Sequence, residues 1–329
     1  AWTETRTVIG DQVLPEMTVE VGSPTYTDPS SGIVYANCMT PVWFNATDAD
    51  SGAYRIRPEI EIYNMGLGQY EDEFIGWIYD NGAGDTDPTV GSISYIYYFP
   101  QDCDHRLRMR RADDYAGNVN TTGPARVWQY YYVDCTPGMT LKTIGSPSHD
   151  AGYWVTTWTP ITLDAMELLG AYCASGIAEI HYRIDGGGWN SVAGDTVTVY
   201  FPFEGIHTIS WYCVDNIGNV EAINGPQEHH VDDSPPVLDF AVGTPQIEVI
   251  PDLEYFVTSA TQIDIFATEQ RGGAHFTPTY DIYYEILYDG MVYGPFGPFD
   301  DTDFTFGDFA WSDDCDHLVT IWAVDDLQN

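Results

Sequence analysis

One segment recurs in this chain of 329 residues, and its spacing restricts the fold more than any other feature. In each copy an Asp ends a β-type run, and a Gly-Ser-Pro or Gly-Thr-Pro turn follows it. The step from Asp134 to Gly145 is 145 − 134 = 11, and the step from Asp232 to Gly243 is 243 − 232 = 11. Self-similarity of this kind is the signature of repeated structural units. The sequence therefore predicts a series of related domains.

The same interval is found at the beginning of the sequence, where the step from Asp11 to Gly22 is 22 − 11 = 11. We call the last strand of a repeat, which ends at this Asp, its closing strand. By the spacing, residues 1–11 correspond to a closing strand whose own domain is absent. They contain Trp, Thr, Val and Ile but no Pro, so their amides can join a β-ladder. We expect this segment to be a donor strand formed by Thr3, Thr5, Arg6, Thr7, Val8, Ile9 and Gly10.

An Asp-x-x-Gly-Asn turn precedes each interior closing strand, at Asp114–Asn118 and Asp215–Asn219. Its Gly tolerates a positive φ, and its Asp and Asn can satisfy the amides of the turn. The third copy reaches this turn without a closing strand behind it, and has Gln328 where Gly is expected. We expect the acceptor side of a strand exchange to lie at Asp325, Asp326 and Asn329.

The spacing between the repeated glycines predicts the size of the domains. It is 145 − 22 = 123 residues for the first interval and 243 − 145 = 98 for the second. Immunoglobulin-like sandwiches of roughly 100 residues fit these intervals. The predicted organisation is a donor strand and linker in 1–16, followed by domains in 17–136, 137–235 and 236–329, with an insertion at about 63–89 in the first domain and an incomplete third domain.

Short β-branched and aromatic runs predict an all-β fold. Residues 92–99 and 195–201 are of this kind, and apolar and polar residues alternate in 161–165. Residues 180–184 lead into Asp185-Gly186, a sequence typical of a tight hairpin. We predict three tandem immunoglobulin-like β-sandwiches, the third without its last strand, and an N-terminal donor strand.

Six cysteines without a Cys-x-x-Cys pair favour disulfides over a metal site. Cys173 and Cys213 are the two cysteines of the second repeat, so we predict that they pair with each other. Two of the others begin matching Cys-Asp-His turns, and a bridge between subunits is one of the alternatives. The pairing of four cysteines stays open: Cys38, Cys103, Cys135 and Cys315.

A formal net charge of −39, with only 11 Lys and Arg, argues against a nucleic-acid partner because phosphate binding needs a basic surface. No apolar run is long enough to span a bilayer. The sequence starts at Ala1 without Met, which indicates a mature exported form at the cell surface or outside the cell. With export, Asn45 and Asn120 are candidate N-glycosylation sites.

Carboxylates gather in several loops, and Ca²⁺ takes six to eight oxygens from flexible loops of this type. Calcium is accordingly the one cofactor that we consider, with solvated acidic loops as the alternative. The candidate ligands are Asp48, Asp50, Asp300, Asp301 and Asp303.

The chain has no Gly-x-Ser-x-Gly elbow, no His-Glu-x-x-His motif, no phosphate-binding loop and no Gly-x-Gly-x-x-Gly after a predicted strand. We therefore predict a protein that is not an enzyme. The 24 Tyr and 10 Trp could line a glycan-binding face, although core packing explains them more simply.

Four motifs follow one another in the second repeat: Thr-Pro-Ile-Thr-Leu-Asp-Ala, Tyr-Arg-Ile-Asp-Gly-Gly, Gly-Ile-His-Thr-Ile and Val-Asp-Asn-Ile-Gly-Asn. Their order resembles the immunoglobulin-like repeats of large archaeal and bacterial cell-surface proteins, and the resemblance is closest in 144–236. It implies a stalk, a surface-layer component or a filament subunit. Some archaeal extracellular filaments of this kind assemble by donor-strand complementation.

Physical reasoning also favours strand donation, because a sandwich without its last strand exposes a sheet edge that a partner strand would cover. Donor and acceptor lie at opposite ends, so the contact propagates as a fibre unless a ring closes. We predict a structural subunit of an extracellular filament that polymerises head to tail with copies of itself and serves adhesion or cohesion, with cell surfaces and glycans as further partners. The alternatives are a segment of a tandem-repeat stalk or surface-layer protein, and a carbohydrate-binding adhesin module.

Overall fold

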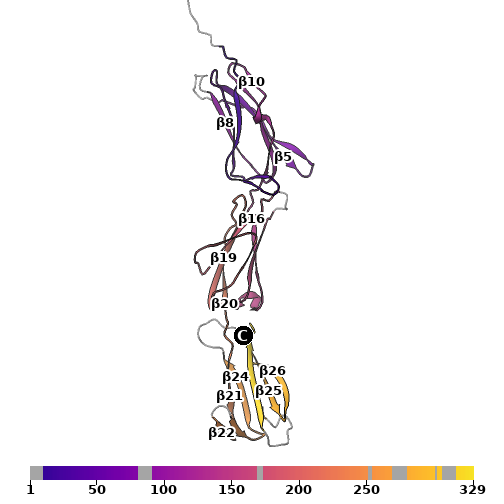
Figure 1. The fold of residues 1–329 in the computed structure, drawn as a ribbon, viewed down its shortest axis with the longest axis vertical. Coiled ribbons are helices and arrows are strands. Elements are labelled where there is room, and N and C mark those ends of the chain that lie inside the picture. The colour runs from indigo at the N-terminus through magenta and orange to yellow at the C-terminus, as the bar shows by residue number, and fades with distance from the viewer. Residues whose placement is uncertain are drawn as a thin grey trace, which may run out of the picture.

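The structure, a computed structural model, describes residues 10–80, 91–168, 173–250, 254–268, 280–300, 302–305 and 316–329. These residues form β-strands and two 3-10 turns, η2 (Pro124–Arg126) and η3 (Asp150–Gly152), with no α-helix among them. The predicted all-β class is confirmed. Within this part of the chain no helix could span a membrane. The sheets form three successive groups along an elongated molecule, which we call the first, second and third units (Figure 1).

The first unit has a three-stranded sheet, β1-β4-β8, and a larger sheet in the order β2-β3-β11-β9-β5-β6, in which β10 also pairs with β9 and β7 with β5. Its strands are β1 (Glu16–Val21), β2 (Thr25–Thr27), β3 (Val34–Ala36), β4 (Pro41–Thr47), β5 (Ala53–Asn64), β6 (Gln69–Ile75), β7 (Ile78–Tyr79), β8 (Ser92–Tyr98), β9 (Cys103–Asp114), β10 (Val119–Asn120) and β11 (Gln129–Val133). The predicted insertion at about 63–89 contributes β6 and β7, which both pair with β5.

The second unit repeats this plan with a sheet β12-β15-β18 and a sheet β13-β14-β20-β19-β16-β17. Its strands are β12 (Met139–Ile144), β13 (Ser148–His149), β14 (Trp154–Val155), β15 (Ile161–Met166), β16 (Ile177–Ile184), β17 (Asn190–Ala193), β18 (Thr196–Val199), β19 (Gly205–Asp215) and β20 (Asn224–Val231). The hairpin predicted after residue 184 is confirmed, since Asp185 (φ 52°) and Gly186 (φ 66°) both have the positive φ of a type I′ turn.

The third unit is divided into three small sheets, β21-β24-β27, β22-β23 and β26-β25-β28. Its strands are β21 (Val237–Val242), β22 (Gln246–Ile250), β23 (Glu254–Val257), β24 (Gln262–Thr268), β25 (Tyr280–Tyr288), β26 (Met291–Phe299), β27 (Thr302–Thr305) and β28 (His317–Asp325).

Each unit has its own hydrophobic core between two layers of strands. Alternate residues of β15, which are Ile161, Leu163 and Ala165, point inward, and they pack with Ile180 of β16 and Ile209 of β19 from the opposite sheet. The alternation follows from the strand geometry, which turns successive side chains to opposite faces. Equivalent clusters form between β4 and β9 in the first unit and between β24 and β25 in the third.

Candidate functional site

The strand that closes the larger sheet distinguishes the third unit from the other two. In the first unit β11 pairs in parallel with β3 and antiparallel with β9. In the second unit β20 pairs in the same way with β14 and β19. In the described part of the third unit no strand lies between β23 and β28, which are the counterparts of β14 and β19. This open strand position is the candidate site.

The side chains beside the open position are more exposed than their counterparts in the second unit. On β19, the inward residues His207, Ile209, Trp211 and Cys213 are buried. On β28, the corresponding residues are only half-buried: His317, Val319, Ile321 and Ala323. Since the third unit repeats the motifs of the second, we attribute the difference to the open strand position beside β28 in the described part of the chain.

The strands on the far side of the open position carry apolar residues that face solvent. Ile247 and Val249 of β22 and Phe256 of β23 are exposed. Val257 of β23 is half-buried, whereas its counterpart Val155 in β14, which pairs with β20, is fully buried. Exposed apolar strands beside an unpaired edge are favourable for pairing with another strand.

The same hydrogen bond is found at the end of both closing strands, β11 and β20. The side-chain amide of Asn219 donates to the backbone carbonyl of Asp134, directly after β11, over 2.9 Å. The amide of Asn329 donates to the carbonyl of Asp232, directly after β20, over 2.9 Å. In the turns themselves, Oδ1 of Asp215 accepts the amides of residues 217, 218 and 219.

Asp11 occupies this same position ahead of the first unit, because the amide of Asn118 donates to its carbonyl over 3.4 Å. By this geometry Asp11 corresponds to Asp134 and Asp232, the residues that directly follow β11 and β20. Of the predicted donor residues, Gly10 is exposed, and Thr3, Thr5, Arg6, Thr7, Val8 and Ile9 lie outside the described residues.

The predicted acceptor turn is formed in the third unit. Asp325 is buried, and its Oδ1 accepts the amides of Leu327 and Asn329, each over 2.8 Å. Gln328 replaces the Gly of the other copies and adopts the positive φ that the turn requires, 71°. Asp326 lies 3.8 Å from His149 of the second unit.

The predicted disulfide between Cys173 and Cys213 is wrong. Cys173 is bonded to Cys103 of the first unit, with a Cα–Cα distance of 4.9 Å, and Cys38 is bonded to Cys135, with a Cα–Cα distance of 5.3 Å. Cys213 is a buried free thiol, and burial raises its pKa to about 12.

The prediction failed because the units stack end to end. Cys173 of the second unit therefore lies against the end of the first unit that carries Cys103. Both bridges therefore lie at the junction of the first and second units. Cys315 lies outside the described residues.

The two candidate glycosylation sites differ in their surroundings. Asn45 lies on β4, and its amide donates weakly to the hydroxyl of Thr18 over 3.4 Å. Asn120 is engaged more firmly, since its amide donates to the carbonyl of Pro15 over 2.8 Å. A glycan on Asn120 would leave one N–H on that nitrogen, and only this hydrogen could still donate to Pro15.

The carboxylates predicted to bind calcium do not form one group. Asp48 is buried near Asp11 and Asp114, whereas Asp50 and Asp300 are exposed. Asp301 and the side chain of Asp303 lie outside the described residues.

A second acidic group, Asp134, Glu167 and Asp215, was not predicted. Part of its signal was in the sequence, because Asp134 begins the repeated Asp-to-Gly interval and Asp215 begins the repeated Asp-x-x-Gly-Asn turn. Burial raises the pKa of Glu167 to about 7, with the charges of Asp134 and Asp215 adding to the effect.

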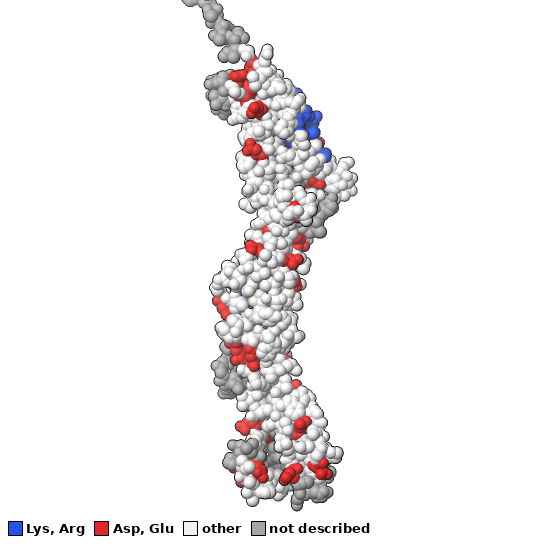
Figure 2. All heavy atoms as spheres, viewed as in Figure 1, with Lys and Arg blue, Asp and Glu red and all other residues white. Residues whose placement is uncertain are grey.

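Acidic residues are spread over all three units, whereas Lys and Arg gather on one side of the first (Figure 2). The basic side chains there come from β5 and β9 and are matched by acidic neighbours. Arg108 donates to Glu59 over 2.5 Å and lies 4.1 Å from the ring of Trp128, and Arg55 donates to Asp113 and covers Trp77. These contacts tie the outer face of the sheet together.

The comparisons with known proteins do not assign a family. No protein-family model and no curated protein matches the chain. Among solved structures, it is similar to dimeric latent PorU from Porphyromonas gingivalis, at 14% identity and a TM-score of 0.24, over 94% of this chain. It spans only 30% of the length of PorU.

Two further solved structures show a similar degree of likeness. One contains the fibronectin(III)-like modules of Clostridium thermocellum CbhA, at 15% identity and a TM-score of 0.28, over 63% of this chain and 90% of that one. The other is red sea bream transglutaminase, at 6% identity and a TM-score of 0.22, over 66% of this chain and 31% of that one. With scores this low, function has to be argued from the residues themselves.

Proposed function

We propose that this protein is an extracellular structural protein built from three tandem immunoglobulin-like sandwiches, and that another copy of the chain supplies the closing strand of the third sandwich. The observation that carries the proposal is the open strand position between β23 and β28, at which the second unit has β20. Repetition along a series of copies gives a fibre suited to adhesion or to cohesion between cells.

The position of Asp11 supports the choice of donor. Its carbonyl accepts the amide of Asn118, as the carbonyls after β11 and β20 accept those of Asn219 and Asn329. A segment ending at Asp11 has therefore the register of a closing strand. Placed in the third unit of another copy, it would follow the turn at Asn329 as β20 follows the turn at Asn219.

The energetics favour such a joint. Pairing on both sides would form about six ladder hydrogen bonds, each worth roughly 0.5–1.5 kcal/mol. Covering the half-buried residues Val319 and Ile321 of β28 would add burial of apolar surface, at about 25 cal/mol per Å². The contact joins two different surfaces of the protomer, which is the arrangement that propagates.

A second candidate is supported by the same open position, namely a longer tandem array in which the closing strand follows in the same polypeptide. The two differ in covalent continuity. Under denaturing, reducing conditions, native fibres built by strand exchange should release single chains of one mass. A ladder of higher masses, or one very long chain, would instead favour the array.

The direct test uses substitutions in the donor segment. Val8→Asp places a charge on the strand that would enter the third unit, and we expect it to abolish fibre formation in electron microscopy. Val127→Asp is the matched control, since Val127 is 66% exposed in the first unit, and it should polymerise normally. Normal fibres from the Val8→Asp protein would contradict strand donation by this segment.

A further inference from the structure

Two clusters of carboxylates lie at corresponding places in the first and second units. In each cluster, one carboxylate oxygen from each of three residues lies within 4.8 Å of the other two. The clusters are Asp11, Asp48 and Asp114 in the first unit, and Asp134, Glu167 and Asp215 in the second.

The three members of each cluster have the same structural origins. The first member, Asp11 or Asp134, lies in the linker that enters the unit and accepts the Asn amide described above. The second follows the strand β4 or β15. The third is the last residue of β9 or β19. Each cluster thus joins the entering linker, a loop and a turn at one end of a unit.

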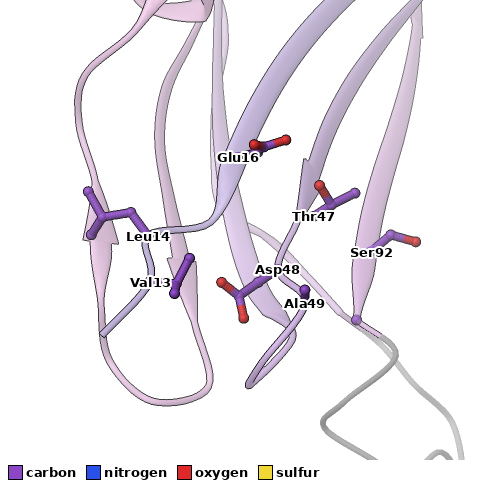
Figure 3. A pocket seen from close by; sticks show the side chains of 8 residues that line it. Val13, Leu14, Glu16, Thr47, Asp48, Ala49 and Ser92 are labelled. Carbon is purple, nitrogen blue, oxygen red and sulfur yellow. The ribbon is translucent and has the colours of Figure 1, made fainter. Parts of the chain in front are cut away.

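Asp48 has one carboxylate oxygen that is bonded and one that is free. Its Oδ1 accepts the amides of Asp50, Ser51 and Gly52 over 2.8–3.1 Å. Asp48 is only 7% exposed, and its Oδ2 is buried. This oxygen nevertheless has no hydrogen-bond partner among the described residues. In Figure 3 the carboxylate of Asp48 points toward the linker that carries Val13, and both residues line a pocket of about 470 Å³.

The second cluster has the same features. Asp134 and Asp215 are almost fully buried. Oε1 of Glu167 is buried and has no partner in the described part of the chain. Beside it, the amide of Ser175 donates to Oδ2 of Asp134 over 2.7 Å, and the buried hydroxyl of Ser175 has no described partner either.

These carboxylates are not neutralised by basic side chains. None of the six forms an ion pair with a Lys, Arg or His that the structure describes. Backbone amides and Asn side chains offset only part of the charge. Burying several carboxylates side by side is strongly unfavourable unless a positive charge joins them. Burial also raises the pKa of Asp215, as it does that of Glu167.

We propose that each cluster binds a divalent cation of the calcium type, so that an ion holds the entering linker to the end of the unit. The donors are carboxylates, with a serine hydroxyl beside them in the second cluster, and such hard oxygen donors on loops suit Ca²⁺. The unpartnered oxygens of Asp48 and Glu167 are the ones directed at the ion. The site does not depend on strand exchange.

The second cluster places its ion at the junction of the first and second units. Asp134 follows the last strand of the first unit, and Glu167 and Asp215 belong to the second. An ion bound there would resist bending of the linker between them. In the third unit the corresponding Asp232 and Asp325 are buried, and residues 269–279 lie outside the described residues.

Calcium titration of the complete chain by calorimetry tests the proposal. We expect tight sites in the wild-type protein, loss of one with Asp48→Asn, loss of one with Glu167→Gln, and loss of two in the double variant. Asp50→Asn is the matched control, because Asp50 is an exposed neighbour on the same loop, and it should keep every site. A wild-type protein without tight sites, or equal losses in Asp48→Asn and Asp50→Asn, would overturn the proposal.

Thermal unfolding is an independent test, because the effect of Glu167→Gln on the unfolding midpoint should change sign between chelator and excess calcium. In chelator, Glu167→Gln removes a buried charge, so its midpoint should equal or exceed that of the wild type. In excess calcium, the same variant should unfold at a lower temperature than the wild type, because it lacks a ligand. The same shift in both conditions would mean that no ion binds there. Sodium chloride at matched ionic strength separates binding from screening.

Discussion

The second and third units share their motifs and differ in one strand. In the second, β20 joins β14 to β19, and the three lie in one six-stranded sheet. In the third, β22-β23 and β26-β25-β28 remain separate sheets in the described part of the chain. The comparison shows that the closing strand does more than add hydrogen bonds at a sheet edge. By pairing with β14 on one side and β19 on the other, it joins two groups of strands into one sheet.

Local features form equally well in both units. The buried hydroxyl of Thr159 donates to the carbonyl of Pro147 over 2.5 Å, and that of Thr261 donates to the carbonyl of Pro245 over 2.6 Å. In the first unit Thr40 makes the same bond to Pro24. These contacts span at most 16 residues of sequence, so they do not need the closing strand. Only the long-range pairing differs.

The largest expected effect comes from supplying the third unit with a strand. Appending residues 1–11 after Asn329 through a short flexible linker should stabilise the third unit by about 5–10 kcal/mol, from ladder bonds and burial. Hydrogen exchange should show β28 protected as strongly as β19. The same extension with Thr7→Pro is the control, since proline cannot donate to a ladder. Equal protection with and without the extension would contradict an open position.

Removal of the disulfides should affect the first and second units and leave the third unchanged. The bridges close loops with sequence separations of 97 and 70 residues, so the loss of each should cost about 2–5 kcal/mol. Cys38→Ser with Cys103→Ser removes both bonds, and unit-resolved hydrogen exchange measures the result. In Cys213→Ala, peptide mapping should still find both bridges. A Cys173–Cys213 peptide in the wild-type protein would contradict the assigned pairing.

Side-chain truncations on the equivalent strands β19 and β28 should lower the free energy of unfolding by unequal amounts. Ile209→Ala on β19 removes a fully buried side chain and should destabilise the second unit by about 2–5 kcal/mol. Ile321→Ala on β28 removes a half-buried one and should cost less than half as much. With the appended strand, the two costs should converge. Chemical denaturation of both variants, with and without the extension, measures the difference.

The smallest effect concerns pH, because β20 brings a buried histidine to a half-buried lysine. Nζ of Lys142 lies 2.6 Å from Nε2 of His229, and Nδ1 of His229 lies 2.6 Å from the carbonyl of Gly152. Burial, together with Lys142, lowers the pKa of His229 to about 4, and burial lowers that of Lys142 to about 8. The third unit has Phe240 in place of this lysine.

The sign of the pH effect follows from these directions. The folded second unit binds fewer protons than the unfolded chain between about pH 4 and pH 6.5, so its stability falls as the pH drops through that window. Between about pH 8 and pH 10.5 its stability rises with pH, owing to Lys142. Lys142→Met should abolish the alkaline rise and shift the midpoint by only a few degrees. An alkaline rise that persists in this variant would assign it to another group.

Much of the fold was accessible from the sequence because its signals are local. The alternation in residues 161–165 predicted β15, and Asp185-Gly186 predicted the hairpin that follows β16. The Asp-x-x-Gly-Asn turn is formed in all three units, even with Gln328, because the bonds to the Asp carboxylate lie within five residues. Such features depend on φ/ψ preferences and on short-range hydrogen bonds.

The β-class, the repeat and the turns can be predicted from the sequence, since each is encoded in side-chain alternation or in adjacent residues. The bond of Cys173 to Cys103 instead of Cys213, and the proximity of Asp134, Glu167 and Asp215, arise from packing between units. The physical reason is the end-to-end stacking of units, which brings the base of one against the end of the next. Spacing along a chain orders its residues, but contacts between stacked units depend on how those units are oriented.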